Sequence, residues 1–250
     1  MQNALIIGML AVVLFSLAVG YYIAPQAQPQ ALAKGPQATA SPAQQAARQG
    51  ITVQIPAIDE NGEGKVARVN VQEMPGSGRV LIELGPDNPI IGGDTQDSIR
   101  TAVELGKMFS TRDTAAIDLR YSISAPSDEV SGKSAGAAVA VATMALLRGE
   151  RLRPDTIITG TVNSRGVIGP VGGVLQKAKA AGQMGFRRII VPVGEATAAK
   201  SETRCTQTSS PNGVRRECTR TAAQVSVAAE TGLEVFEVRD AGEALELWRE

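Results

Sequence analysis

Residues 129–147 read EVSGKSAGAAVAVATMALL, and this stretch decides the fold of the region around it. From Ser134 onward it is small or apolar at nearly every position, which is typical of a helix buried on almost all sides. Alternating apolar residues at 117–123 predict a strand before it, so Ser134 lies at or just inside the helix start. Backbone N–H groups there stabilise a developing anion, which makes Ser134 a candidate nucleophile. Its alternative role is that of a helix cap.

The sequence on either side predicts an α/β fold with mixed α+β layers. Alternating apolar residues indicate strands over 53–55, 66–71 and 80–84, joined as a β-meander. A helix capped by Asp94 or Thr95 follows. Beyond residue 155 strands alternate with helices, which indicates α/β layering. The elements predicted there are a strand–turn–strand over 157–170, helices at 174–185, 221–232 and 241–250, and strands at 187–193 and 233–238.

Composition excludes several kinds of chemistry. The 250-residue chain has no histidine, two cysteines, and 25 basic and 25 acidic side chains. Without histidine it cannot form a Ser-His-Asp triad or a histidine-ligated zinc site, and two cysteines are too few for a thiolate cage. Balanced charge and 3% aromatic residues argue against binding to nucleic acid. We therefore expect hydroxyl, lysine or carboxylate chemistry, or binding alone, with no metal and no cofactor.

Lys177 is the candidate base for Ser134. A serine at neutral pH needs a base, and in a chain without histidine this is a lysine kept neutral by burial. Lys177 lies among alanines in the predicted helix 174–185, directly after the Gly172–Gly173 pair. On the apolar side of that helix its pKa would fall, whereas Lys179 is expected to be solvated. The alternative is that Lys177 is an ordinary surface lysine.

Three ordered segments resemble the proteolytic domain of Lon-type Ser-Lys proteases. They are SGKSAG at 131–136, ITGTVNSRGVIGPVGG at 158–173 and VLQKAKAAGQMGFRRIIVP at 174–192. The resemblance covers roughly residues 51–250 and is most specific from about 118 to 193. It implies a serine endopeptidase that acts on polypeptides and assembles as a homo-oligomer.

The resemblance assigns roles to individual residues. Ser134 is implied as the nucleophile, Lys177 as the general base and Thr159 as the residue that hydrogen-bonds the lysine. Gly132, Lys133 and Ala135 flank the nucleophile as supporting residues.

Two features depart from the family pattern. The family commonly has an acidic residue shortly before the serine, in the same loop. This chain has Ser131, Gly132 and Lys133 there, with Asp128 and Glu129 slightly earlier. Lys133 is expected to assist an oxyanion, to lower the pKa of Lys177 by repulsion, or to alter substrate preference. Lon enzymes also usually carry an ATPase module upstream, which is not found here. The chain thus resembles membrane-anchored or exported archaeal Lon-like proteases without that module, which implies ATP-independent cleavage of unfolded or flexible polypeptides.

The N-terminal 50 residues predict a membrane segment and a tether. Residues 4–23 are twenty uncharged, mainly apolar residues, enough to span a bilayer as an anchor or to act as a long signal peptide. Residues 24–50 contain nine Ala, seven Gln and four Pro, which predicts a linker before the domain at 51–250. Lys34 and Arg48 favour a cytoplasmic domain by the positive-inside rule. The export-like position of the segment and a cysteine pair favour an extracytoplasmic domain, which we expect.

Cys205 and Cys218 form that pair. They lie in a polar stretch at 200–220 that we predict to be a loop with its turn at Pro211–Gly213. In an oxidising compartment they would close a disulfide loop, which stabilises by about 3 kcal/mol in the chain-entropy model. In a reducing cytosol they would be free thiols.

Two other functions stay open. Residues 127–134, SDEVSGKS, differ from the phosphate-binding pattern G-x-x-x-x-G-K-[ST] only in having Ser127 for its first glycine. No later strand ends in the aspartate that would hold magnesium. The other alternative is a tethered interaction domain that keeps the Lon-like shape without activity.

Overall fold

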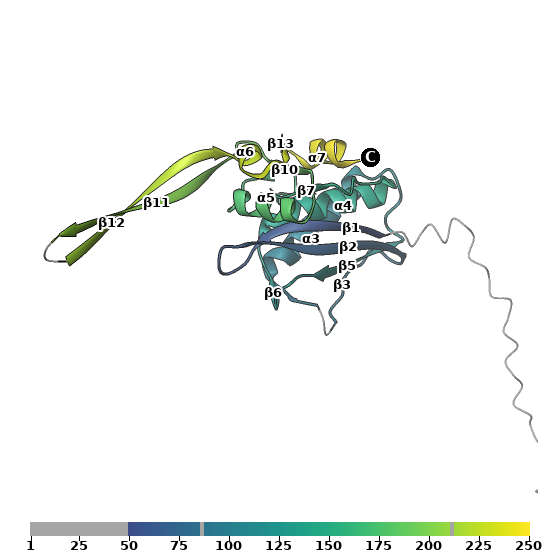
Figure 1. Cartoon of the computed structure of the whole chain (residues 1–250). Coiled ribbons are helices and arrows are strands. Elements are labelled where there is room, and N and C mark those ends of the chain that lie inside the picture. The colour runs from purple at the N-terminus through teal and green to yellow at the C-terminus, as the bar shows by residue number, and fades with distance from the viewer. Residues whose placement is uncertain (1–49, 86–87, 211–212) are drawn as a thin grey trace, which may run out of the picture. The chain divides into compact units, whose positions relative to one another are not determined.

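The computed structural model describes residues 50–85, 88–210 and 213–250 (Figure 1). The predicted membrane segment at 4–23 and residues 24–49 of the predicted linker lie outside these ranges. Gly50, assigned above to the linker, is instead the first residue of strand β1. Within the described ranges no helix is both long and apolar enough to cross a membrane.

The first sheet has the strand order β1-β2-β5-β3. Its alternating residues point apolar side chains to one face, where Val69, Val71 and Tyr121 are buried. The predicted meander is wrong in its third strand, because β3 pairs in parallel with β5 and does not contact β2 in the ladder. The physical reason is Asp118 at the start of β5, whose carboxylate accepts backbone N–H groups of Ser77 and Arg79 and so holds the connection before β3 against β5. The strands are β1 (Gly50–Ile58), β2 (Gly64–Pro75), β3 (Val80–Ile82) and β5 (Ile117–Ser124).

Two helices cover this sheet. Helix α4 (Gly136–Arg148) is buried at every position from Gly136 to Leu147, as the small apolar sequence predicts. It packs against α3 (Gly93–Phe109), where a Cβ on Gly106 would meet Thr143 at 2.7 Å, so the two helices approach closely. The short elements before α4 are β4 (Ile90–Ile91), β6 (Glu129–Val130) and the single 3₁₀ turn η1 (Lys133–Ala135).

The second half contains a parallel sheet of order β13-β10-β7, which confirms the predicted α/β layering. Figure 1 shows α5 between this sheet and the first one, with α7 at the C-terminal end. The elements are β7 (Thr156–Ile158), β8 (Thr161–Val162), β9 (Ile168–Gly169), α5 (Val174–Gln183), β10 (Arg188–Pro192), α6 (Val227–Thr231), β13 (Glu234–Val238) and α7 (Ala241–Trp248).

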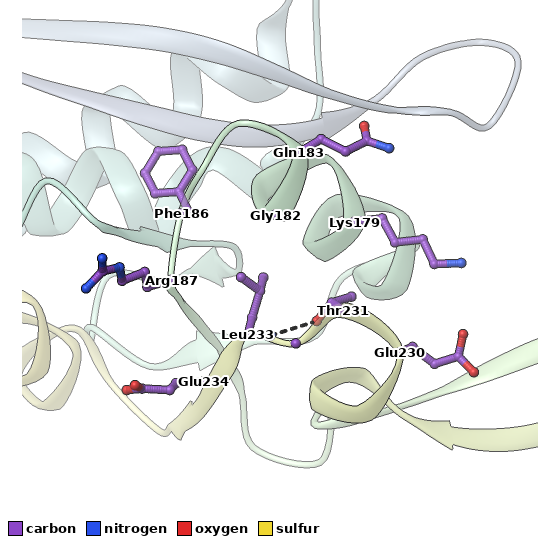
Figure 2. Close-up of a pocket in the computed structure, with 10 residues that line it drawn as sticks. Lys179, Gly182, Gln183, Phe186, Arg187, Glu230, Thr231, Leu233 and Glu234 are labelled. Atoms are coloured by element: carbon purple, nitrogen blue, oxygen red, sulfur yellow. Dashed lines mark hydrogen bonds between the residues drawn. The ribbon is translucent and has the colours of Figure 1, made fainter.

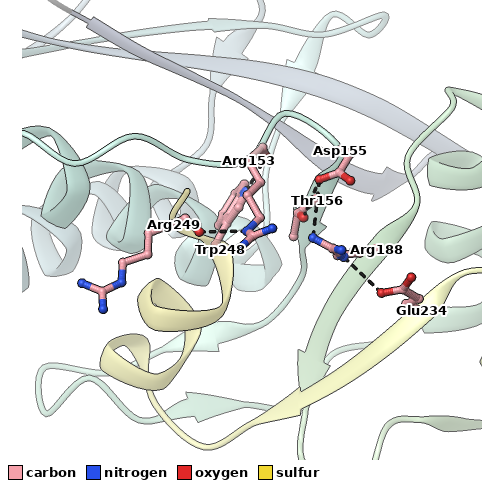
Figure 3. A network of polar contacts seen from close by, with 7 residues as sticks. All are labelled: Arg153, Asp155, Thr156, Arg188, Glu234, Trp248 and Arg249. Atoms are coloured by element: carbon pink, nitrogen blue, oxygen red, sulfur yellow. Dashed lines mark hydrogen bonds and ion pairs between the residues drawn. The ribbon is translucent and has the colours of Figure 1, made fainter.

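Polar contacts hold the C-terminal helix to the start of this sheet (Figure 3). Trp248 is almost fully buried and donates its indole N–H to the carbonyl of Arg153 at 3.1 Å. The Arg153 guanidinium donates to the carbonyl of Arg249 at 2.8 Å. Arg188 on β10 lies between Asp155 and Glu234, next to the neighbouring strands on either side. These contacts fix the start of β7, the strand that leads to Thr159.

Residues 197–226 differ from the prediction. The polar loop is a hairpin of two 14-residue strands, β11 (Thr197–Ser210) and β12 (Gly213–Ser226), and extends away from α6 (Figure 1). The helix predicted at 221–232 begins only at Val227, after Ser226 accepts the N–H of Ala229 as its cap. Both faces of the hairpin are largely exposed, so the sequence shows no apolar alternation there. Cys205 and Cys218 lie directly opposite each other and form the expected disulfide.

We predict that this disulfide holds the distal hairpin together. An isolated two-stranded hairpin is marginally stable, and the crosslink contributes about 3 kcal/mol. In a Cys205→Ser, Cys218→Ser double variant, amide exchange in β11 and β12 should rise at least about tenfold, while β10 and β13 remain protected. Serine at the opposed pair Gln207 and Arg216 is the control and should leave the hairpin protected. Equal exchange in both variants would contradict the prediction.

Candidate active site

Ser134 lies in the 3₁₀ turn η1, immediately before α4. The backbone reaches it through Gly132, whose φ of 111° is a conformation that favours glycine. The backbone carbonyl of Ser134 accepts the N–H of Gly160 at 3.1 Å, and the carbonyl of Gly160 accepts the N–H of Ala137 at 3.0 Å. The serine is thus fixed between the start of a buried helix and the segment that follows β7.

Thr159 joins the two predicted catalytic residues. It is fully buried at the end of β7, and its backbone N–H donates to the carbonyl of Ile190 on β10 at 3.1 Å. Its hydroxyl donates to the carbonyl of Ser134 at 3.4 Å and accepts a hydrogen bond from Lys177 Nζ at 3.3 Å. The structure therefore brings Ser134, Thr159 and Lys177 together, although they lie on three different segments.

Lys177 is a buried lysine with an altered proton affinity. It is 3% exposed and lies on α5, whose neighbouring alanines Ala178, Ala180 and Ala181 are buried as well. Burial lowers the pKa of Lys177 to about 8, and the carboxylate of Glu195 acts in the opposite direction. A substantial fraction of this amine is therefore neutral just above neutral pH.

The start of α5 explains the glycine pair before Lys177. Gly173 is left-handed, with φ 65°, and a Cβ there would lie 1.8 Å from Ile58 Cδ1. The carbonyl of Gly173 accepts the first helical hydrogen bond from the Lys177 N–H at 3.0 Å. This turn therefore fixes both the position and the direction of the helix that carries the lysine.

The supporting residues divide into two groups. Ala135 packs partly buried against the main core, and Gly132 supplies the turn described above. Lys133, by contrast, is exposed, and its amine lies 3.8 Å from the carboxylate of Asp94. The influences on the pKa of Lys177 are burial and Glu195, so repulsion by Lys133 stays a prediction.

Sequence reasoning missed Glu195. It follows β10 as Thr159 follows β7, and these two strands are adjacent and parallel. Residues just beyond the carboxyl ends of adjacent parallel strands lie at one edge of the sheet, so a signal was present once the strand order was known. Among the residues that the structure describes, no group of three or more acidic or cysteine side chains is placed to hold a metal ion.

Two hollows flank this region. A groove of about 490 Å³ lies between the β1–β2 connection and residues 125–131, and reaches Ser131, three residues before Ser134. Figure 2 shows another hollow, of about 710 Å³, between α5 and α6. Lys179 and Glu230 line that second hollow, and Ser134, Thr159 and Lys177 are not among its lining residues. The groove beside the serine turn is therefore the better placed of the two for a substrate chain.

A mixed α/β domain that brings a serine, a threonine and a buried lysine together has the arrangement expected of a Ser-Lys peptidase domain. Comparison with known families agrees: the model of the Lon protease (S16) C-terminal proteolytic domain matches residues 60–203, more than half of the chain. The chain belongs to this family.

Individual relatives support the assignment. A Lon protease of Phenylobacterium zucineum is 29% identical over an alignment of 137 residues that covers 52% of this chain and 16% of that protein. Lon protease 4 of Sorangium cellulosum is 34% identical over 132 residues, with the same coverage of 52% and 16%. Lon protease 1 of Herpetosiphon aurantiacus is 43% identical over 75 residues, 30% of this chain and 9% of that protein. The chain thus spans about a sixth of the length of the first two relatives.

Proposed function

We propose that this protein is a serine endopeptidase in which Ser134 is the nucleophile and Lys177 is the general base. The observation that carries the proposal is the hydrogen-bonded series Lys177–Thr159–Ser134, which ends on a buried amine with a lowered pKa. An inactive interaction domain would not need a lysine at 3% exposure, because burying an amine is energetically costly.

The chemistry follows from the positions of these groups. Neutral Lys177 accepts the proton of the Ser134 hydroxyl as its oxygen bonds to the substrate carbonyl carbon. Backbone N–H groups of the turn that carries Ser134 stabilise the resulting oxyanion. The lysine ammonium then gives its proton to the leaving amine as the peptide bond breaks. Water hydrolyses the acyl-enzyme, with Lys177 again taking a proton and Ser134 regaining one.

We further propose that cleavage needs no ATP and is limited to unfolded or flexible polypeptides. The family match supports a proteolytic domain, and the groove that ends at Ser131 offers room for an extended chain near Ser134. The test is to incubate the full chain, without nucleotide, with an unfolded protein and with a stable folded one. Only the unfolded protein should be cut, and a fluorophosphonate should label Ser134. Degradation of the folded substrate upon addition of ATP would contradict the proposal.

We also propose that residues 4–23 anchor the protein in a membrane and that the domain is extracytoplasmic. The disulfide between Cys205 and Cys218 supports an oxidising surrounding. Protease added to intact cells should digest the domain, and the two thiols should react with a maleimide only after reduction. A shielded domain with freely labelled thiols would place it in the cytoplasm.

Thr159 provides a graded test of the site. Thr159→Val removes the hydroxyl that bridges Lys177 and Ser134 at nearly constant volume, so kcat should fall by about 10-fold to 1000-fold. Thr159→Ser keeps the hydroxyl and should retain most of the activity. Hydrolysis of a quenched fluorescent peptide measures both. Equal rates for the valine and serine variants would show that the hydroxyl has no role.

A further inference from the structure

Glu195 is a half-buried residue whose carboxylate the steps above do not use. Its Oε1 accepts the backbone N–H of Val171 at 2.9 Å. Its Oε2 is buried and, within the described part of the chain, has no hydrogen-bond partner. A buried carboxylate oxygen without a partner is unfavourable, so its presence needs a physical explanation.

The hydrogen bond to Val171 connects Glu195 with the helix of Lys177. Val171 lies two residues before Gly173, whose carbonyl accepts the N–H of Lys177. No side chain caps the start of α5, and Gly173 is left-handed. The Glu195 carboxylate is therefore a side-chain tie that holds this glycine turn in place.

Glu195 also lies at the same edge of the sheet as Thr159. It comes three residues after β10, whose Ile190 carbonyl holds the N–H of Thr159. Its negative charge opposes the effect of burial on the pKa of Lys177. An anion near a buried amine stabilises the protonated form of that amine.

We propose that Glu195 is a positioning residue for Lys177, which ties the start of α5 to the end of β10 and stabilises the lysine ammonium formed when Ser134 loses its proton. The proton moves only from the serine oxygen to the lysine nitrogen, and Glu195 itself takes up none. The inference rests on the proposed function in this one respect, that Lys177 takes up a proton during catalysis.

Other charged groups near α5 are engaged elsewhere or exposed. Lys179 on α5 itself is exposed, as are Lys133 on η1 and Arg68 on β2. The remaining charged side chains on elements packed against α5 are paired: Lys65 with Asp59 and Glu63, Glu73 with Arg112, Arg188 with Asp155 and Glu234, and Glu230 with Lys200.

Glu195→Gln tests the charge while keeping an oxygen for the Val171 N–H. The rising limb of the kcat–pH profile should move to lower pH by roughly one unit, and kcat at the plateau should fall severalfold because the base is weaker. KM should change little, since no substrate contact is removed. Glu195→Ala, which also releases Val171, should lose more activity than Glu195→Gln.

Glu237→Gln is the matched control. Glu237 accepts the N–H groups of Gly194 and Ala196, on either side of Glu195, and is exposed. It therefore holds the same segment and carries the same charge, yet does not act on the pKa of Lys177. This variant should leave the position of the pH profile unchanged.

A readout without substrate separates this inference from the proposed function. In the full chain labelled with ¹³Cε-lysine, the Lys177 signal, assigned with a Lys177→Arg variant, should titrate at lower pH in Glu195→Gln than in Glu237→Gln. Equal midpoints in the two variants would overturn the role of Glu195 even if the protein is a peptidase. A lowered midpoint in a protein without peptidase activity would support that role and overturn the proposed function.

Discussion

Ser134→Ala and Lys177→Met variants of the full chain are each expected to lose peptide hydrolysis by about 1000-fold or more. The first removes the atom that would bond to the substrate carbonyl. The second removes the amine that donates to the Thr159 hydroxyl, and leaves no other base within the hydrogen-bonded series. The measurement is kcat/KM on a quenched fluorescent peptide at pH 8 to 9.

Each variant has a control from its own neighbourhood. Ser164→Ala alters an exposed serine in the turn between β8 and β9, and Lys179→Met alters the exposed lysine on the same helix as Lys177. Both should retain activity within a few-fold of the unchanged protein. Near-normal turnover by Ser134→Ala or Lys177→Met would exclude the Ser-Lys mechanism.

The second large effect concerns stability: Lys177→Met, which should abolish activity, should also stabilise the fold. A pKa that falls from 10.5 to about 8 on folding corresponds to about 3 kcal/mol of stability lost at pH values below 8. Methionine fills the same space without a charge. At pH 7 the melting temperature of the Lys177→Met variant should therefore be higher than that of the unchanged protein by roughly 5 to 10 °C. Scanning calorimetry on the two proteins measures the difference.

The pH dependence of the free energy of unfolding tests whether the buried Lys177 amine destabilises the fold when it is protonated. Between pH 8 and 10.5 the folded protein has lost the Lys177 proton, whereas the unfolded chain still holds it. The unfolded state then binds more protons, so the free energy of unfolding rises with pH across this window. Lys177→Met should lack this rise, and the exposed control Lys179→Met should keep it. A lower melting temperature for Lys177→Met at pH 7 would contradict the assignment of burial as the dominant cause.

The catalytic candidates could be predicted because few chemistries remained. With no histidine in the chain, a hydroxyl nucleophile needed a lysine, and only Lys177 combined alanine neighbours with a preceding glycine pair. The tertiary contact that joins Ser134 and Lys177 through Thr159 came from the family resemblance, since spacing along the chain does not reveal it. Glu195 was missed for the same reason, because its neighbours depend on the order of β7 and β10.

The fold could be predicted where burial is one-sided or complete. Helix α4 and the strands of the first sheet follow from apolar patterns, whereas the parallel pairing of β3 with β5 depends on Asp118 and not on any periodicity. Residues 200–226 carried no pattern because neither face of that hairpin is buried. Strand pairing there rests on backbone hydrogen bonds and the disulfide, which leave no hydrophobic signal.

For protein engineering, the distal part of the β11–β12 hairpin is a segment that can be shortened. Its base is closed by the hydrogen bond from the Val227 N–H to the Ala196 carbonyl at 2.9 Å and by the pairing of Thr197 with Ser226. Beyond Lys200 nearly every residue of the arm is exposed, and the family match ends at residue 203, inside the arm. A tight turn joining opposed residues near the base could replace the distal arm without disturbing Ser134 or Lys177. Substitutions at the exposed tip of the arm should therefore cost little stability, whereas substitutions at its hydrogen-bonded base should cost more.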